Sequence, residues 1–220
     1  AAQSGATRIT GTFLRVDRSG PTPVIIYKDR QSGKQERLPT KLIIGADGAR
    51  SSVAQAEITG GGVTPYVMAY HEIIEAPEPD ASYSTMRCDV IYDGRISPDF
   101  YGWVFPHGAQ ASVGMGSGIK GVDVKKATAD LRAASGLEEC ETIRREGAPI
   151  PLKPLDRWDN GNDVLLAGDA AGVVAPSSGE GIYYAMACGT SAALATARRL
   201  RTGLASDLKL SRKLFDVAPH

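Results

Sequence analysis

The sequence predicts an α/β fold (α+β overall), in which a partial Rossmann-like domain is interrupted by an inserted antiparallel β-sheet domain. Two short apolar strands, each followed by a Gly/Asp turn and a helix, lie about 120 residues apart. The stretch between them alternates apolar and polar residues, as the strands of an antiparallel sheet do. We therefore expect three segments: 1–58 and 153–220 from the first domain, and 59–152 as the insert.

The first segment predicts a small antiparallel element that leads into a strand–turn–helix unit. Residues 8–16 and 22–28 look like strands, and Ser32-Gly33 forms a turn before a further strand through Arg37. The run Leu42–Ile44 then predicts a buried strand, and Ala49–Glu57 a helix. The turn between them, Gly45-Ala46-Asp47-Gly48, carries one carboxylate.

The insert predicts four strands and one helix. The strands are YVMAYHEII, MRCDVIY, FYGWVFP and ASVGMGS, which alternate or run as apolar segments. The helix spans Val124–Ser135, where apolar residues recur at helical spacing and Gly136 supplies the stop.

The last segment repeats the strand–turn–helix device. Val164–Ala167 is apolar throughout, as in the interior of a parallel sheet, so Asp169 should emerge at the carboxyl end where α/β folds place ligands. A long helix is expected from Gly181 to about Arg201, and a last one over Ala205–Phe215.

The composition argues for a globular protein and against several classes of partner. With 42% hydrophobic residues in 220, the chain can build a normal core. Lys+Arg and Asp+Glu balance at 25 each, so no basic field recruits nucleic acid. The 3 cysteines lack metal-ligand spacing, which favours a reducing compartment and predicts no metal site. No apolar run approaches the roughly 20 residues that span a bilayer, so we expect a soluble or peripheral protein.

The residues around Asp47-Gly48 have two readings. Asp and Gly are common turn residues, and a tight turn alone would explain them. Arg50, Ser51 and Ser52, however, stand at the start of the next helix, where they could reach a phosphate together with the helix N–H groups. The functional reading is a site that binds a diphosphate.

The second unit points more clearly to a dinucleotide cofactor. Asp169 can accept hydrogen bonds from a sugar-like hydroxyl, and the dipole of the helix that begins near Gly181 can stabilise negative charge on a cofactor ring. Several glycines and a proline surround it, where the backbone has to approach a ligand closely: Gly168, Gly172, Pro176 and Gly179.

LIIGADGARSSV followed by LLAGDAAGVVAPSSGEGI resembles the flavoproteins of the p-hydroxybenzoate hydroxylase fold. SPDFYGWVFPHG, ETIRREGAPIPLKPL and GEGIYYAMACG are further similar to geranylgeranyl reductases of the bacteriochlorophyll type. The resemblance covers residues 8–203, with the motifs in family order. It implies an FAD-dependent oxidoreductase that uses NADPH to reduce isolated C=C bonds of a geranylgeranyl chain in bacteriochlorophyll or chlorophyll biosynthesis, on a diphosphate or a pigment-attached substrate.

The resemblance also assigns roles to residues of this chain. Asp169 would bind the ribityl chain of FAD, and Gly179 and Gly181 would let the backbone approach the isoalloxazine ring. Asp47, Gly48 and Arg50 would lie near the FAD diphosphate and the nicotinamide nucleotide. The same cofactor-binding motif contains the remaining expected contacts, namely Gly168, Gly172, Pro176 and Ile182.

The catalytic candidates lie in the insert. Tyr101, Trp103 and Phe105 share one face by alternation and could flank the flavin or a polyprenyl tail, although an aromatic core strand would show the same pattern. His107 could supply the proton that accompanies hydride addition, and Tyr101 is another candidate acid. His107 can also be read as a loop residue beside Pro106 and Gly108, and His71 as part of an apolar strand.

The family pattern is not matched throughout. The strand, G-x-G-x-x-G turn and helix with which these flavoproteins begin have no counterpart here, nor does their C-terminal portion. We therefore expect a complementing chain or self-association to cover exposed sheet edges, and a cytoplasmic location with peripheral association at the photosynthetic membrane. An aromatic-ring monooxygenase of the same fold, or a non-catalytic module, is the alternative.

Overall fold

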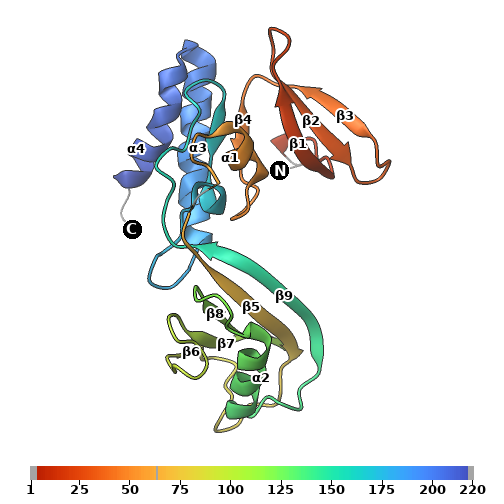
Figure 1. Ribbon diagram of the computed structural model, residues 1–220, viewed down its shortest axis with the longest axis vertical. Coiled ribbons are helices and arrows are strands. Elements are labelled where there is room, and N and C mark those ends of the chain that lie inside the picture. Colours follow the sequence, from red (N-terminus) through yellow and green to blue (C-terminus); the bar gives the residue numbers. More distant parts are fainter. Residues whose placement is uncertain (1–3, 63, 218–220) are drawn as a thin grey trace. The chain divides into compact units, whose positions relative to one another are not determined.

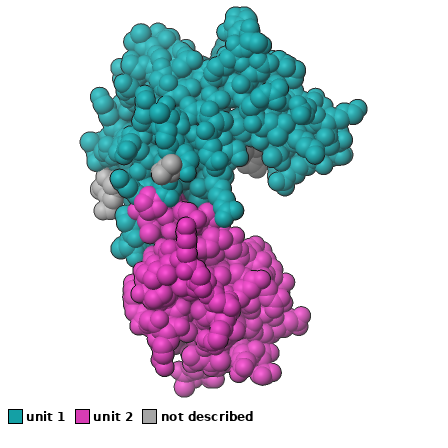
Figure 2. All heavy atoms as spheres, viewed as in Figure 1, with its two compact units in different colours: residues 1–64, 153–220 teal, residues 65–152 magenta. Residues whose placement is uncertain are grey.

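A computed structural model describes residues 4–62 and 64–217 of the chain. The chain forms two compact units, which are coloured separately in Figure 2. Unit 1 comprises residues 1–64 and 153–220, and unit 2 comprises residues 65–152. The two units are described in turn.

Unit 1 begins with an antiparallel meander of β1 (Gly11–Asp17), β2 (Val24–Asp29) and β3 (Gln35–Pro39), which confirms the predicted strands (Figure 1). The turn between β2 and β3 is fixed locally. The Asp29 carboxylate accepts hydrogen bonds from the N–H groups of Gln31 and Ser32, at 3.0 and 2.6 Å.

A parallel pair of strands forms the centre of unit 1. β4 (Ile43–Gly45) pairs with β10 (Val164–Leu166) in the register Ile43 to Val164, so the two predicted strands lie side by side. β10 is buried along its whole length, as expected. The prediction of a wholly buried Leu42–Ile44 strand is wrong, because Ile44 is 44% exposed. β4 alternates, and only its Ile43 face packs on the core of unit 1.

The helices of unit 1 are α1 (Ser52–Glu57), α3 (Ile182–Thr202) and α4 (Leu210–Asp216). Short 3₁₀ turns precede α3 and α4, at η2 (Gly168–Ala171) and η3 (Ala205–Lys209). The long helix is confirmed. The first helix begins at Ser52 instead of Ala49, because Ser51 adopts the non-helical N-cap conformation. The last predicted helix is divided between η3 and α4.

Unit 2 is a five-stranded antiparallel sheet in the order β6-β7-β8-β5-β9 (Figure 1). Its strands span Tyr66–Glu75 (β5), Asp89–Ile91 (β6), Gly102–His107 (β7), Gln110–Ser117 (β8) and Thr142–Pro151 (β9). The amphipathic helix is confirmed as α2 (Val124–Ala134), which Asp123 caps through Lys126 N–H.

The two faces of this sheet differ in chemistry. On one face, Ile74, Val113 and Met115 pack in an apolar cluster with Leu131 of α2. On the opposite face, Trp103, Gly114, His71 and Glu146 stand in one row across β7, β8, β5 and β9. The second face therefore carries aromatic and polar groups. Among the described residues, no helix has the length and apolar character needed to cross a membrane.

Candidate functional site

The carboxyl ends of β4 and β10 bring the two sequence motifs of unit 1 together. Leu166 pairs with Gly45, and Ala167 N–H donates to the Gly45 carbonyl at 3.0 Å. The loop that carries Asp47 and the loop that carries Asp169 therefore start at the same sheet edge. Between them lies a cavity of about 30 Å³, lined from both loops and the segment after α1 by residues that include Ala49, Ser51, Asp169 and Gly172.

Asp47 uses its carboxylate to cap α1. Its Oδ2 accepts the N–H groups of Ser52 and Val53 at 2.7 and 3.2 Å, and its Oδ1 accepts the Ser51 hydroxyl at 2.5 Å. Ser51 Oγ in turn accepts Ala54 N–H at 2.8 Å. The amides at the start of α1 thus already hold an anion, while Gly48 lies beside them at φ +83° and Arg50 is exposed.

We expect Asp47→Ala to lower the free energy of unfolding by about 1 kcal/mol, the usual effect of losing a helix cap. Urea unfolding checks this, with Asp47→Asn as the matched variant that keeps an acceptor oxygen and should lose less. An unchanged midpoint in Asp47→Ala would show that the carboxylate does not hold the helix start.

Asp169 is placed differently, because its partly buried carboxylate has no side-chain partner among the described residues. Burial raises the pKa of Asp169, and its own backbone N–H is the group that opposes this. A Cβ on Gly181 would lie 3.2 Å from Asp169 Oδ1, so a side chain there would crowd the carboxylate. A Cβ on Gly172 would come within 2.5 Å of the Lys153 carbonyl oxygen, and its φ of +76° also requires glycine.

The loop that begins at Asp169 leads to the start of α3 at Ile182. Glu180 Oε1 accepts Tyr183 N–H at 2.9 Å, so an acidic side chain already caps this helix. Gly179 has φ +68°, Gly168 has φ +61°, and Gly181 is the N-cap residue. Pro176 is exposed and Ile182 is 77% exposed, so neither is held by the core.

In unit 2, the aromatic candidates do share one face. The Trp103 ring lies 6.0 Å from that of Tyr101 and 6.2 Å from that of Phe105, measured between centroids. Tyr101 and Trp103 are buried. Burial, with a smaller effect of Tyr92, raises the pKa of Tyr101, which makes its hydroxyl a weaker acid. His107 is exposed at the end of β7, where it pairs with Gln110.

The structure adds a group that the sequence reading discounted. His71 Nδ1 lies 2.8 Å from Ser112 Oγ, and His71 Nε2 lies 3.1 Å from Glu146 Oε2. Trp103 Nε1–H donates to the same Ser112 Oγ at 3.1 Å. Glu146, His71, Ser112 and Trp103 thus form one hydrogen-bonded chain across four strands. Only the strand register brings these residues together, since Ser112 and Glu146 lie 41 and 75 residues from His71 in the sequence.

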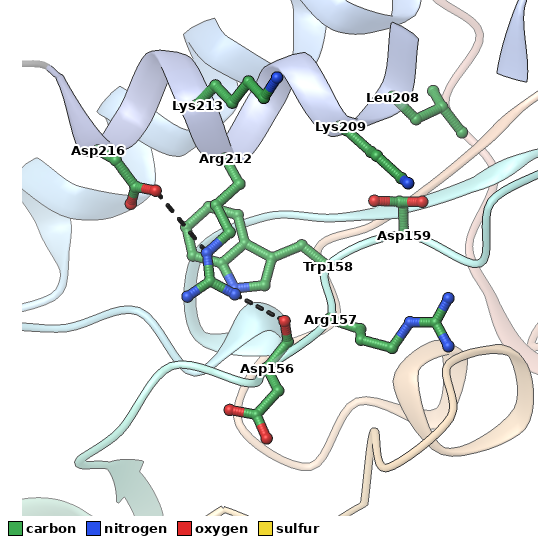
Figure 3. Close-up of a pocket in the computed structure, with 9 residues that line it drawn as sticks. All are labelled: Asp156, Arg157, Trp158, Asp159, Leu208, Lys209, Arg212, Lys213 and Asp216. Carbon is green, nitrogen blue, oxygen red and sulfur yellow. Dashed lines mark hydrogen bonds and ion pairs between the residues drawn. The ribbon is translucent and has the colours of Figure 1, made fainter. Parts of the chain in front are cut away.

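A pocket of about 300 Å³ lies elsewhere in unit 1, between the segment before β10 and the C-terminal helices (Figure 3). The Arg212 guanidinium stacks over Trp158 at 5.4 Å and donates to the Asp156 carbonyl at 2.7 Å. The pocket carries both acidic and basic side chains. It is lined by Asp156–Asp159, Leu208, Lys209, Arg212, Lys213 and Asp216. It contains none of the sequence-predicted site residues.

No protein-family model matches the chain. Among curated proteins, it is similar to geranylgeranyl diphosphate reductase of Rhodobacter capsulatus, at 56% identity over 98% of this chain and 54% of the relative. It is also similar to the chloroplastic geranylgeranyl diphosphate reductase of rice, Oryza sativa subsp. japonica, at 36% identity over 98% of this chain and 49% of the relative. The chain spans about half the length of these relatives.

Solved structures support the same fold. A geranylgeranyl bacteriochlorophyll reductase-like protein from Thermoplasma acidophilum aligns with a TM-score of 0.80 at 22% identity, over 98% of this chain and 55% of that one. Aklavinone-11 hydroxylase, solved with FAD and aklavinone, aligns at a TM-score of 0.62 and 21% identity, over 87% of this chain and 37% of that one. The structures show the fold, and the sequence similarity shows that the chain is a homologue of geranylgeranyl diphosphate reductases that spans about half of their length.

Proposed function

We propose that this chain forms the FAD-motif and substrate-binding part of an NADPH-dependent geranylgeranyl reductase. The observation that carries the proposal is the convergence of the Asp47 and Asp169 loops at one edge of the β4–β10 pair. In open α/β sheets this edge is where nucleotide cofactors bind. The similarity to geranylgeranyl diphosphate reductases supports the substrate class.

The residues at this edge fit FAD. Asp169 offers a half-buried carboxylate whose pKa burial already raises, so a hydroxyl donor would stabilise its charged form. The ribityl chain of FAD supplies such hydroxyls. Gly168, Gly172 and Gly179 supply the positive φ that this loop requires, and Gly181 leaves the Asp169 carboxylate uncrowded. Asp47 is a structural cap in the free chain, which leaves Gly48 and Arg50 as the proposed diphosphate contacts.

Bound FAD, once reduced, would supply the hydride for the alkene. The chain's part is to orient the substrate, to exclude water and to provide a proton. An isoprenoid tail needs an apolar surface, and we assign this to the face of the unit 2 sheet that carries Tyr101, Trp103 and Phe105. The substrate would be a geranylgeranyl diphosphate or a geranylgeranyl-bearing pigment, reached by peripheral association with the photosynthetic membrane.

Unit 1 also presents surface that suits a partner segment. Its parallel sheet has two strands in the described part of the chain, and Ile44 is exposed on β4. Along α3, Ile182, Met186 and Leu194 are 77%, 70% and 55% exposed. We propose that a complementing chain or a second copy covers these residues, because exposed apolar strand edges promote association.

The test is a reconstitution with FAD followed by an anaerobic assay with NADPH and geranylgeranyl diphosphate. We expect retained flavin, flavin bleaching by NADPH and mass increases of two units per reduced double bond. Rapid NADPH oxidation that consumes oxygen without alkene reduction would instead support the monooxygenase reading. A folded chain that neither retains nor reduces flavin would favour the non-catalytic module.

A further inference from the structure

Another pocket of unit 1 lies at the carboxyl end of α3, the opposite end from the Asp169 loop. α3 runs for 21 residues, which is about 30 Å of helix. The volume of this pocket is about 320 Å³, and a water in the liquid takes about 30 Å³, so the pocket has room for an ion of several heavy atoms. We refer to it as the α3-end pocket. It is lined by Pro21–Pro23, Thr40–Leu42, Arg199, Leu200 and Gly203.

The charge on this lining is positive only. Lys41 and Arg199 are its charged side chains, and no acidic residue is among the described residues that line it. Within the described part of the chain, neither cation forms an ion pair. The neighbouring Arg198, by contrast, is paired with Asp207 at 3.0 Å. The α3-end pocket therefore attracts an anion, and its cations have no protein carboxylate to compete for them.

Arg199 places a buried donor at this pocket. Its Nε is shielded from solvent and has no hydrogen-bond partner among the described residues, and the same holds for Thr196 Oγ1 one turn earlier on α3. A buried polar group without a partner destabilises the fold unless a ligand or solvent supplies one. The guanidinium donors of arginine have the fork geometry that matches the oxygens of a phosphate. An oxyanion is thus the ligand that Arg199 suits best.

Hydrogen bonds hold the segments that form the walls. Thr40 N–H donates to the Pro23 carbonyl at 2.9 Å, and the Thr40 hydroxyl donates to the Leu42 carbonyl at 2.7 Å. These bonds join the end of the β1–β3 meander to the segment before β4. On the α3 side, Gly203 N–H donates to the Arg199 carbonyl at 3.0 Å. Lys41 and Arg199 thus line one space from two backbone segments that are fixed locally.

The dipole of α3 opposes an anion at this end, but its effect is the smaller one. The carboxyl end of a helix carries a partial charge of about −0.5. Lys41 and Arg199 each contribute a full positive charge. Gly203 N–H also occupies the Arg199 carbonyl, one of the groups that create the partial charge. The net field in the α3-end pocket is therefore positive.

We propose that the α3-end pocket binds a phosphate group through Arg199 and Lys41, either as a free phosphate or as the headgroup of an anionic lipid. The loops proposed to bind flavin take no part in this site, which lies at the other end of α3. The site is additional to the proposed function and does not depend on it.

The first experiment titrates the 220-residue chain with inorganic phosphate and diphosphate by calorimetry at constant ionic strength. We expect saturable binding to wild type and an affinity lower by about 10 to 100-fold in Arg199→Gln, as for the loss of a charge-assisted hydrogen bond. Lys41→Gln should also weaken binding. Arg201→Gln is the matched control, because it removes the same charge from the last turn of α3 outside the pocket lining, and it should bind as wild type does.

Two results of this titration would overturn the proposal: a folded wild type that takes up neither anion, or equal weakening in Arg199→Gln and Arg201→Gln, which would indicate general surface charge. Thermal unfolding guards against misfolding. Phosphate should raise the midpoint of wild type and Arg201→Gln by binding the folded state and should leave that of Arg199→Gln unchanged.

The second experiment identifies the source of the phosphate by sedimentation with phosphatidylcholine vesicles that contain or lack phosphatidate. Binding that requires phosphatidate, is lost in Arg199→Gln and persists in Arg201→Gln would identify a lipid headgroup. Binding of free phosphate without vesicle binding would identify a soluble phosphate ligand. Vesicle binding that Arg199→Gln and Lys41→Gln leave intact would contradict a headgroup in this pocket. Both experiments are done without flavin, so a failure to retain FAD would count against the proposed function alone.

Discussion

Arg132→Leu should destabilise unit 2 by about 3–5 kcal/mol, the range for removing one partner of a buried ion pair. Arg132 is buried, and its guanidinium donates to Glu72 Oε2 at 2.6 Å and to Thr142 Oγ1 at 2.7 Å. It also donates to the carbonyls of Leu137, Glu138 and Cys140. Leucine fills part of the space but leaves the three carbonyls without this donor and removes one of the donors to Glu72. Urea unfolding in a Trp158→Phe background, in which Trp103 of unit 2 is the remaining tryptophan, measures the loss by fluorescence.

The pH dependence of this stability loss tests whether it comes from the ion pair between Arg132 and Glu72. Burial alone would raise the pKa of Glu72, but hydrogen bonds from Tyr70, Arg132, Thr142 and Arg145 outweigh it and lower the pKa below 4.5. A carboxyl with a lowered folded-state pKa stabilises the fold above its unfolded pKa, and this stabilisation is lost as the pH falls through the folded value. The difference between wild type and Arg132→Leu should therefore shrink in acid. Lys126→Leu on the same helix removes only the exposed pair with Asp130 and should change stability by less than about 1 kcal/mol. Equal effects of the two variants would contradict the account.

Asp169→Asn should weaken flavin binding by about 10 to 100-fold while it stabilises the free chain at neutral pH. The first effect follows from losing charge-assisted hydrogen bonds, worth about 1.5–3 kcal/mol each. The second follows from burial, which raises the pKa of Asp169. Since a raised pKa means that ionisation costs the folded state more than the unfolded state, a neutral side chain removes this cost above the folded pKa.

The opposite signs make the measurement discriminating. Flavin titration followed by fluorescence gives the affinity, and thermal unfolding without flavin gives the stability. Asp163→Asn is a matched variant next to β10. The Asp163 carboxylate accepts a hydrogen bond from Arg18 at 2.8 Å, so this variant should be less stable but should bind flavin as wild type does. If Asp169→Asn lowered both quantities, Asp169 would be a structural residue.

The fold of this chain follows from the sequence where the local pattern decides the structure. The apolar β10 strand, the long α3 helix and the amphipathic α2 helix are all confirmed. Boundaries were less predictable, because Ser51 and Asp47 set the start of α1 by a particular cap geometry. Burial of Ile44 was predicted wrongly, since an apolar run does not tell which faces of a strand are covered.

The candidate site shows the same limit. The Gly/Asp turns of both units could be found because they follow apolar strands, and their meeting at one edge follows from the parallel pairing of β4 and β10. That Asp47 caps α1 could not be read from the sequence, since an exposed cap and a ligand contact use the same residue types. The hydrogen-bonded chain from Glu146 to Trp103 depends on how β5 pairs with β8 and β9. The β5–β9 pairing includes an irregularity between Ile73 and Ile74, which the sequence does not reveal.

The central claim is that the two loops at the carboxyl ends of β4 and β10 form a flavin-binding surface. The most direct test is an amide NMR titration of the 220-residue chain with FAD, which also detects weak binding. We expect shifts concentrated at Asp47–Ser52 and Gly168–Ile182, and their loss in Asp169→Asn. A folded chain whose amides in these loops do not respond to FAD, or respond no more than those of the β1–β3 meander, would contradict the claim.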